Sequence, residues 1–513
     1  MLKVKQALIS VSDKTGIVDF ARKLHELGVR IISTGGTMKA IADAGIPVTY
    51  ISDITHFPEM MDGRVKTLHP FIHGGILAVR DNTSHMQAMA EHGILGIDLV
   101  VVNLYPFRQT IAKAAVTLAE AIENIDIGGP AMIRSAAKNF RFVGVVVNPN
   151  RYAQVLAEIT EQGEIAATTR MALAREAYSH TAAYDSCITE YLAGQLGEGA
   201  FPVTIHPGYE KIQDLRYGEN PHQTAAFYKE QFATTGIASA KQLHGKELSF
   251  NNIVDVEAAY GIVSDFTAPA AAIIKHSNPC GTGTGSSLSE AYGKALASDP
   301  VSAYGGIIAL NRSVDQATAA AISQTFMEAV IAPAFDDEAL AILTKKKNLR
   351  LLTAPLFTAA NQAFDMKKVS GGLLVQQADR QIESRDTMKV VTTKAPTEAE
   401  WEQLQFAWKV VKHVKSNAIV VAGNSQTYGV GAGQMNRVGS VDIALKQAGE
   451  KSHGAVLSSD AFFPFRDSID TAAKAGIAAI IQPGGSIRDQ ECIDAANEQG
   501  IAMVFTGVRH FKH

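Results

Sequence analysis

Residues 270–285 read Ala-Ala-Ala-Ile-Ile-Lys-His-Ser-Asn-Pro-Cys-Gly-Thr-Gly-Thr-Gly, and the larger part of the chain is organised around them. The apolar run 271–274 has the length of a buried strand, and Pro279 with the alternating glycines predicts that this strand ends in a bend. Lys275 and His276 then stand at the carboxyl end of the strand, where open α/β sheets usually place ligands. The pair can supply a proton acceptor and a positive charge. A solvated strand end followed by an anion-binding glycine loop fits the segment equally well.

The overall composition narrows the class of protein. The 513 residues predict about three domains or large subdomains. Lys and Arg number 47 against 51 Asp and Glu, a net charge of -4, so a general nucleic-acid-binding role has no electrostatic support. Small anionic ligands can still bind at local sites.

Cysteine usage and hydropathy predict the compartment. Cys187, Cys280 and Cys492 lie far apart without a Cys-x-x-Cys pair, which argues against a disulfide framework or a structural zinc site. The amino end lacks the long apolar stretch of a signal peptide, and no apolar run reaches membrane-spanning length. We therefore expect a soluble, cytoplasmic protein with no membrane partner.

The amino-terminal segment reads as a βαβ unit, with strands at 7–11 and 29–32 around a helix that Gly28 ends. Ser33-Thr34-Gly35-Gly36-Thr37 follows and leads into a helix near 38–44. Small residues, hydroxyls and a helix start suit a phosphate, although a plain tight turn fits the pattern as well.

The next chemistry-bearing segment is Gly63-Arg64-Val65-Lys66-Thr67-Leu68-His69-Pro70, which is polar and kinked. Arg64 and Lys66 point to the same side of an extended chain and can both address an anion, although a solvated surface loop is an equal alternative. Further on, a strand at 97–104 ends in Tyr105. All three residues are candidates for ligand contact.

A second junction from glycines into a helix is Asp126-Ile127-Gly128-Gly129-Pro130, and the helix then runs to Asn139. Taken singly, Asp126 is better explained as a helix N-cap and Lys138 as a solvated helix end than as catalytic groups.

In combination, the three segments 33–37, 63–70 and 126–130, with Asn103-Leu104-Tyr105-Pro106-Phe107, resemble the IMP cyclohydrolase half of the bifunctional purine-biosynthesis enzymes. The other half of that family is a 5-aminoimidazole-4-carboxamide ribonucleotide formyltransferase. The resemblance implies a methylglyoxal-synthase-like fold and a cyclisation site lined by Lys66, Tyr105, Asp126 and Lys138. It also implies that substrate is bound by Ser12, Lys14, Ser33, Thr34, Gly35, Gly36, Thr37, Arg64, Thr67, Gly128, Gly129 and Asn139.

The clearest break in composition is the glycine-rich stretch 194–202. We place a domain boundary there, which gives a cyclohydrolase domain at 1–199 and a formyltransferase domain at 200–513. Beyond the break, the order of strands and helices at 271–326 is echoed at 418–481, which predicts a duplication.

The resemblance implies that the duplicated halves are two cytidine-deaminase-like subdomains, so the whole chain is of the α/β class. That fold normally uses zinc, but the expected His-x-Glu and Pro-Cys-x-x-Cys pair is absent, since Pro279-Cys280 is followed by Gly281-Thr282-Gly283. We therefore predict no catalytic metal.

Three later segments also match the formyltransferase pattern: Ser416-Asn417, residues 429–437 and residues 459–467. Singly, each is explained by a helix C-cap, a strand bend or core aromatics. Their occurrence in family order implies Lys275, His276 and Asn417 as catalytic residues. It further implies that substrate is bound by Arg216, Tyr217, His222, Gly305, Glu328, Arg437, Phe462, Asp467 and Arg509.

The chemistry so implied has two steps and needs 10-formyltetrahydrofolate as co-substrate and a purine ribonucleotide, in a homodimer. His276 is the expected base for attack by the weakly nucleophilic amine, and Lys275 the expected electrostatic partner. Two rival hypotheses are a deaminase-like hydrolase fused to a phosphate-binding domain, and an amino-terminal nucleotide sensor. A sensor has no need of Lys66, Tyr105, Asp126 and Lys138 together.

Overall fold

The structure is a computed structural model that describes residues 3–197, 199, 201–231, 233–357 and 364–513. It divides into two compact units, Met1–Gly208 and Tyr209–His513. The expected domain boundary between residues 199 and 200 stays a prediction, and Ala200 lies outside the described residues.

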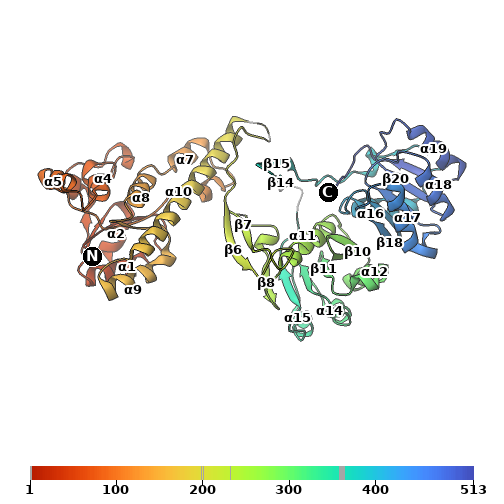
Figure 1. Ribbon diagram of the computed structural model, residues 1–513, viewed down its shortest axis with the longest axis horizontal. Coiled ribbons are helices and arrows are strands. Elements are labelled where there is room, and N and C mark those ends of the chain that lie inside the picture. The colour runs from red at the N-terminus through yellow and green to blue at the C-terminus, as the bar shows by residue number, and fades with distance from the viewer. Residues whose placement is uncertain (1–2, 198, 200, 232, 358–363) are drawn as a thin grey trace. The chain divides into compact units, whose positions relative to one another are not determined.

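The first unit is built on a parallel sheet whose five described strands have the order β3-β2-β1-β4-β5. Figure 1 shows the helices of this unit, among them α1, α2, α8 and α10. The strands are β1 (Gln6–Val11), β2 (Arg30–Ser33), β3 (Thr49–Tyr50), β4 (Leu99–Asn103) and β5 (Gly144–Val146). The chain runs outward from β1 to β3 and then returns to the other side of β1, so the sheet has a switch point between β1 and β4. Open α/β sheets bind ligands at such points.

Helices cover this sheet, because their apolar residues recur at helical spacing; in α1 the buried ones are Ile17, Phe20, Ala21 and Leu24. The helices are α1 (Ile17–Glu26), α2 (Gly35–Asp43), α3 (Ile51–Thr55), α4 (Pro70–Leu77), α5 (Thr83–Glu91), α6 (Phe107–Ile111), α7 (Leu118–Glu123), α8 (Gly128–Lys138), α9 (Tyr152–Gln162) and α10 (Ala167–Leu196), with 3₁₀ turns η1 (Met61–Gly63) and η2 (Pro149–Arg151). Both glycine segments noted above open a helix, α2 and α8.

The second unit contains a mixed sheet of 12 described strands in the order β16-β21-β20-β19-β17-β18-β10-β9-β11-β12-β13-β8. These are β8 (Lys241–His244), β9 (Ala270–Lys275), β10 (Asn278–Thr284), β11 (Ile307–Leu310), β12 (Ala329–Ala332), β13 (Arg350–Thr353), β16 (Lys389–Val390), β17 (Ile419–Gly423), β18 (Gln426–Gly431), β19 (Val456–Ser459), β20 (Ala479–Gln482) and β21 (Ala502–Phe505). Two separate hairpins are β6 (Tyr209–Leu215) with β7 (Ala225–Glu230), and β14 (Phe364–Val369) with β15 (Gly372–Gln377).

The segment 270–285 forms an antiparallel hairpin. His276 and Ser277 have φ of 55° and 62° and make its two-residue turn, so the expected bend is confirmed. The alternative of a glycine loop is wrong, because the glycines form the central strand β10. A Cβ at Gly281 would lie 2.0 Å from the Ala295 oxygen, so the missing side chain lets α12 (Leu288–Ser298) lie directly on the strand.

The second half of this unit repeats the arrangement, which confirms the predicted duplication. Asn424 and Ser425 have φ of 52° and 55° and join β17 to β18. A Cβ at Gly429 would lie 1.9 Å from the Ala444 oxygen of α17 (Arg437–Ala448). β10 and β18 pair with each other, so the strand order is the same read outward from the centre in both directions.

The helices of the second unit form layers on both faces of the sheet. The core cluster under α11 (Phe250–Ser264) and α16 (Glu398–Val411) extends across both halves. On the opposite face, α12 shares one cluster with its neighbouring helices, and α17 shares another. The remaining helices are α13 (Pro300–Ala303), α14 (Gln316–Ser323), α15 (Asp337–Leu343), α18 (Asp467–Lys474) and α19 (Asp489–Glu498), with 3₁₀ turns η3 (Ile237–Ser239), η4 (Arg385–Thr387) and η5 (Gly449–Ser452).

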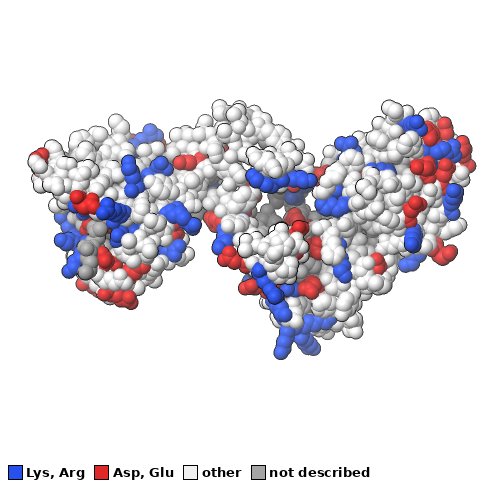
Figure 2. Space-filling view, in the orientation of Figure 1, with Lys and Arg blue, Asp and Glu red and all other residues white. Residues whose placement is uncertain are grey.

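In the part of the chain that the structure describes, no helix combines the length and the apolar character needed to cross a membrane. Both Lys and Arg and Asp and Glu occur over the face shown in Figure 2, in keeping with the net charge of -4. Binding of an anion must therefore come from a local arrangement of groups.

Candidate active sites

A cavity of about 640 Å³ opens at the carboxyl edge of the first unit's sheet, where β1, β2 and β4 end. It thus lies at the switch point of the sheet. Asn103 ties two of these strand ends together, because its Oδ1 accepts the backbone N–H of Ser12 at 2.7 Å. The predicted residues that line the cavity are Ser12, Lys14, Thr34, Gly36, Thr37, Arg64, Lys66, Thr67, Tyr105, Asp126, Gly128 and Gly129.

Two helix N-termini face this cavity. α2 contributes Gly36 and Thr37, and α8 contributes Gly128 and Gly129. Helix starts carry unpaired N–H groups and positive potential, which favours an anion. A Cβ at Gly128 would lie 2.6 Å from Thr67 Oγ1, so a glycine is needed where the two segments meet.

The two cations of the 63–70 segment each hold a carboxylate. Arg64 donates to Glu123, and both side chains are more than half exposed. Lys66 Nζ lies 2.7 Å from Glu59 Oε1 in a more sheltered position. Both cations line the cavity, although the backbone at Arg64 is helical (φ −64°, ψ −28°) and not extended as the prediction assumed.

Asp126 combines a structural and a chemical property. Its Oδ1 accepts the Gly129 N–H at 2.8 Å, which supports the first turn of α8, although the N-cap position itself is Ile127 and not Asp126 as the N-cap explanation had it. Burial raises the pKa of the Asp126 carboxyl, and the N–H groups of Gly129 and Tyr105 and the charge of Lys66 partly oppose that rise. The group is therefore suited to taking up a proton. The Tyr105 side chain beside it is 45% exposed.

Four predicted residues lie outside the cavity lining. Ser33 donates its hydroxyl to the Ile9 oxygen, and Asn139 donates to the oxygens of Ile76 and Ala78, so both serve the fold. Lys138 is exposed in the last turn of α8, roughly 15 Å along the helix from its start. Gly35 precedes the lining residue Gly36. Their contact with substrate stays a prediction.

In the second unit, Lys275 and His276 lie at the end of the central strand β9, on the edge of the large sheet that the strand ends form. Lys275 Nζ donates to the Tyr304 oxygen at 2.9 Å, and the His276 side chain is exposed. The turn is held by Asp255 of α11, whose carboxylate accepts the N–H groups of His276 at 3.3 Å and Ser277 at 2.7 Å. An exposed imidazole on a fixed turn can reach a bound substrate.

The segment before β17 lies at the same edge. Asn278 Oδ1 accepts the Lys415 N–H at 3.1 Å, which joins the hairpin turn to this segment. Asn417 Oδ1 accepts from Arg437 at 2.7 Å, and the same guanidinium lies 2.5 Å from Asp460 Oδ1. The Asn417 amide is therefore oriented by a buried ion pair.

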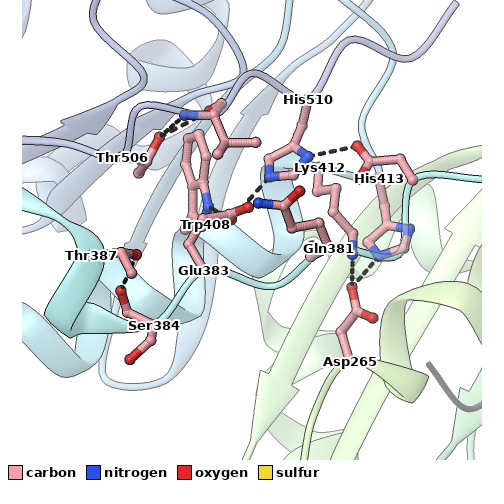
Figure 3. A network of polar contacts seen from close by, with 12 residues as sticks. Asp265, Gln381, Glu383, Ser384, Thr387, Trp408, Lys412, His413, Thr506 and His510 are labelled. Atoms are coloured by element: carbon pink, nitrogen blue, oxygen red, sulfur yellow. Dashed lines mark hydrogen bonds and ion pairs between the residues drawn. The ribbon is translucent and has the colours of Figure 1, made fainter. Parts of the chain in front are cut away.

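The carboxyl-terminal residues return to this edge. The Ser416 N–H donates to the Lys512 oxygen at 2.9 Å, and Lys415 Nζ donates to the His513 oxygen at 2.8 Å. His510 is anchored between two carboxylates, as Figure 3 shows in part: its ring lies 2.6 Å from Asp379 and 3.1 Å from Glu383. The carboxyl terminus therefore lies beside the segment that carries Asn417.

The other predicted transferase residues are more scattered. Gly305 follows Tyr304, whose oxygen accepts from Lys275. Glu328 immediately precedes β12, and its N–H donates to the Gly306 oxygen, so both residues lie near Lys275. Arg216 and His222 are exposed at the tip of the β6–β7 hairpin. The contact of these residues with substrate, and that of Tyr217, Phe462, Asp467 and Arg509, stays a prediction.

Among the described residues, no group of three or more His, Cys, Asp or Glu side chains is arranged to hold a metal ion. The three cysteines are unpaired and buried. Burial raises the pKa of Cys280 and Cys492 to about 12, so both remain thiols.

Sequence analysis missed several groups at these sites. Glu59 and Glu123 hold the two cavity cations, and Asp255 and Asp460 fix the transferase edge. The only signal in the sequence was the presence of carboxylates near or between the quoted segments. Pairing across long sequence separations, such as Ser416 with Asp460, cannot be derived from spacing.

Comparison with known proteins gives a consistent result. Residues 16–131 match the model of the MGS-like domain, and residues 136–447 match that of the AICARFT/IMPCHase bienzyme. Proteins named bifunctional purine biosynthesis protein PurH from Bacillus cereus (strain B4264) and Bacillus mycoides (strain KBAB4) are each 59% identical over 510 residues, covering 99% of this chain and 100% of theirs. A crystal structure of ForH covers 37% of this chain and 98% of its own, with 38% identity and a TM-score of 0.34.

Proposed function

Because the chain belongs to the AICARFT/IMPCHase bienzyme family, we propose that its two sites divide the family's two reactions between them. The chain is a bifunctional formyltransferase and IMP cyclohydrolase that catalyses the last two steps of IMP synthesis. We assign cyclisation to residues 1–199 and formyl transfer to residues 200–513. The observation that carries this assignment is the clustering of the cyclohydrolase residues around one cavity of the first unit.

In formyl transfer, the 5-amine of the aminoimidazole carboxamide ribonucleotide attacks the formyl carbon of 10-formyltetrahydrofolate. A C–N bond forms, the bond from carbon to the folate nitrogen breaks, and a proton moves from the amine to that nitrogen. His276 accepts the amine proton, and its exposed position at the turn supports this role. Lys275 stabilises the oxyanion, and Asn417, held by Arg437, orients the substrate amide.

In cyclisation, the carboxamide nitrogen attacks the new formyl carbon of the same molecule, and water is lost. Positioning dominates such a closure. The α2 and α8 N-termini with Lys14 and Arg64 bind the phosphate, and Lys66 stabilises the oxygen that leaves. Asp126, whose burial favours the protonated carboxyl, and Tyr105 move protons, with Lys138 as a further participant.

The reaction requires purine ribonucleotide and folate, and we propose 10-formyltetrahydrofolate as the formyl donor and no catalytic metal. We also propose a homodimer in the cytoplasm. We further propose that the phosphate of the ribonucleotide binds in the cavity during cyclisation and at Arg216 during formyl transfer.

The decisive experiment assays the two reactions separately. His276→Ala should reduce formyl transfer by roughly a hundredfold to ten-thousandfold and leave cyclisation of supplied formylated intermediate near the parental rate. Lys66→Ala should do the reverse. If either variant melts like the parent and loses both activities or neither, the division of labour is wrong.

A further inference from the structure

Lys66 lines the cavity, but the carboxylate that holds it does not. Lys66 Nζ lies 2.7 Å from Glu59 Oε1, and the Tyr50 hydroxyl donates to Glu59 Oε2 at 3.0 Å. Neither Glu59 nor Tyr50 is among the described residues that line the cavity. Glu59 therefore holds the ammonium from behind, while the front of the ammonium faces the space where substrate binds.

The backbone leaves room for this arrangement. Gly63 has φ of 92°, in the left-handed region that favours glycine. A Cβ at this position would lie 2.5 Å from Glu59 Oε1 and 2.8 Å from Lys66 Nζ. The glycine in the 63–70 segment thus serves the ion pair, and any side chain there would force the pair apart.

The pair is electrostatically coupled to the cavity. Burial lowers the pKa of Lys66, but the hydrogen bond and charge of Glu59, together with smaller effects of Tyr105 and Tyr50, outweigh burial, so the Lys66 pKa is raised. The hydrogen bond from Lys66 in turn lowers the pKa of Glu59. Tyr105 contributes to the rise in the Lys66 pKa, and the charge of Lys66 lowers the pKa of Asp126 against the larger effect of burial. Without Glu59, the two largest effects that oppose the cost of burying the ammonium would be lost.

The second ion pair of the segment, between Arg64 and Glu123, differs from the first in its exposure and in its place in the cavity. Arg64 and Glu123 both line the cavity, and their side chains are 63% and 58% exposed. An arriving phosphate can displace Glu123 from Arg64. Glu59 lies outside the lining, and its second oxygen accepts a hydrogen bond from Tyr50, so a contact outside the cavity fixes its position.

We propose that Glu59 is a positioning residue for cyclisation, which aims the Lys66 ammonium at the reacting oxygen and keeps it protonated. This inference rests on the function proposed above for Lys66. It assigns Glu59 no contact with substrate, so its effect should appear only through Lys66.

The test measures cyclisation of supplied formylated intermediate by the full chain across pH. Glu59→Gln keeps the shape and removes the charge. We expect kcat to fall roughly tenfold to hundredfold with little change in KM, and the alkaline limb of the kcat profile to move to lower pH. Glu59→Asp keeps the charge and should retain the alkaline limb. Tyr50→Phe, which preserves the ion pair, should cause a smaller loss of the same kind.

The matched control is Asp81→Asn, which removes an ion pair with Arg141 (2.6 Å) outside the cavity and should leave kcat, KM and the pH profile unchanged. A merely structural Glu59 would lower the melting temperature without moving the alkaline limb, and that result would overturn the inference.

A double variant separates this inference from the proposed function. If Glu59 acts through Lys66, Lys66→Ala with Glu59→Gln should be no slower than Lys66→Ala alone. If the two losses multiply, or Glu59→Gln has the parental rate while Lys66→Ala is impaired, the inference about Glu59 is wrong. If Lys66→Ala itself cyclises at the parental rate, the proposed function of Lys66 fails instead.

Discussion

Gly281 lies against the backbone of Ala295, so that a Cβ at Gly281 would stand 2.0 Å from the Ala295 oxygen. The equivalent distance from Gly429 to the Ala444 oxygen is 1.9 Å. In both halves of the second unit, a glycine in a central strand thus fixes how closely a helix packs on the sheet. Backbone atoms cannot swing aside as the end of a flexible side chain can, so the two contacts are intolerant of any added atom.

Gly281→Ala should therefore destabilise the second unit by about 3 kcal/mol through overpacking. Urea unfolding of the purified variant measures the change. Gly293→Ala is the matched control, because Gly293 is exposed in α12 and a Cβ there meets nothing within 4 Å. Its helix propensity should make it more stable by up to about 1 kcal/mol. Equal stability of the two variants would contradict the proposed role of Gly281.

The two carboxylates around His510 predict that the folded protein loses stability at alkaline pH. Burial alone would lower the pKa of the imidazole, but the hydrogen bonds and charges of Asp379 and Glu383 raise the pKa of His510 to about 9. Trp408 is the other group that faces it, and its indole N–H donates to Glu383 at 2.7 Å (Figure 3). Because the folded pKa is above the unfolded value, the stabilisation is fully present below about pH 6.5 and is lost as pH rises through about 9.

The size of this contribution is on the order of 3 kcal/mol. Thermal melting at pH 6 and pH 10 should show a larger drop for the parent than for His510→Gln, which has already lost the interaction. Parallel pH dependence in the two proteins would show that His510 does not contribute in this way.

How much the sequence could predict is clearest at particular residues. Short apolar runs located β1, β2 and β4 within two residues of their observed ends, because this signal is local. For the glycines of β10, the sequence could not distinguish a strand from a loop. A glycine-rich segment forms a close-packed strand only where a helix lies on it, and that helix, α12, comes later in the chain. Glu59 and Asp460 escaped prediction because a lone carboxylate has no local signature, and only the folded chain brings each one to its cation.

Arg437 should be irreplaceable by lysine. Its guanidinium donates to Asn417 and Ser459 and pairs with Asp460, and the side chain is buried. A lysine ammonium cannot span all three acceptors from one position. We expect Arg437→Lys to reduce formyl transfer at least tenfold and to leave cyclisation near the parental rate, measured in separate assays. Loss of cyclisation in the same variant would indicate a general folding defect and would contradict a local role.

Treatment with a chelator should leave formyl transfer intact. The zinc signature is missing around Pro279, and the described residues hold no cluster of metal-binding side chains. The measurement compares the rate and the metal content of the protein before and after chelation. A stoichiometric zinc ion whose removal abolishes formyl transfer would refute the prediction.

Finally, a fragment of residues 1–199 should fold and cyclise supplied formylated intermediate. The cavity and its predicted lining residues precede α10, which closes the core of the first unit by packing Leu173, Ala174 and Ala177 into it. A fragment of residues 1–208, the whole compact unit, is the appropriate comparison. Circular dichroism and melting establish that each fragment is folded, and the rate of ring closure then tests the site. Two folded fragments without cyclisation activity would show that the second unit contributes to the cavity's chemistry, whereas activity in 1–208 alone would move the functional boundary to residues 200–208.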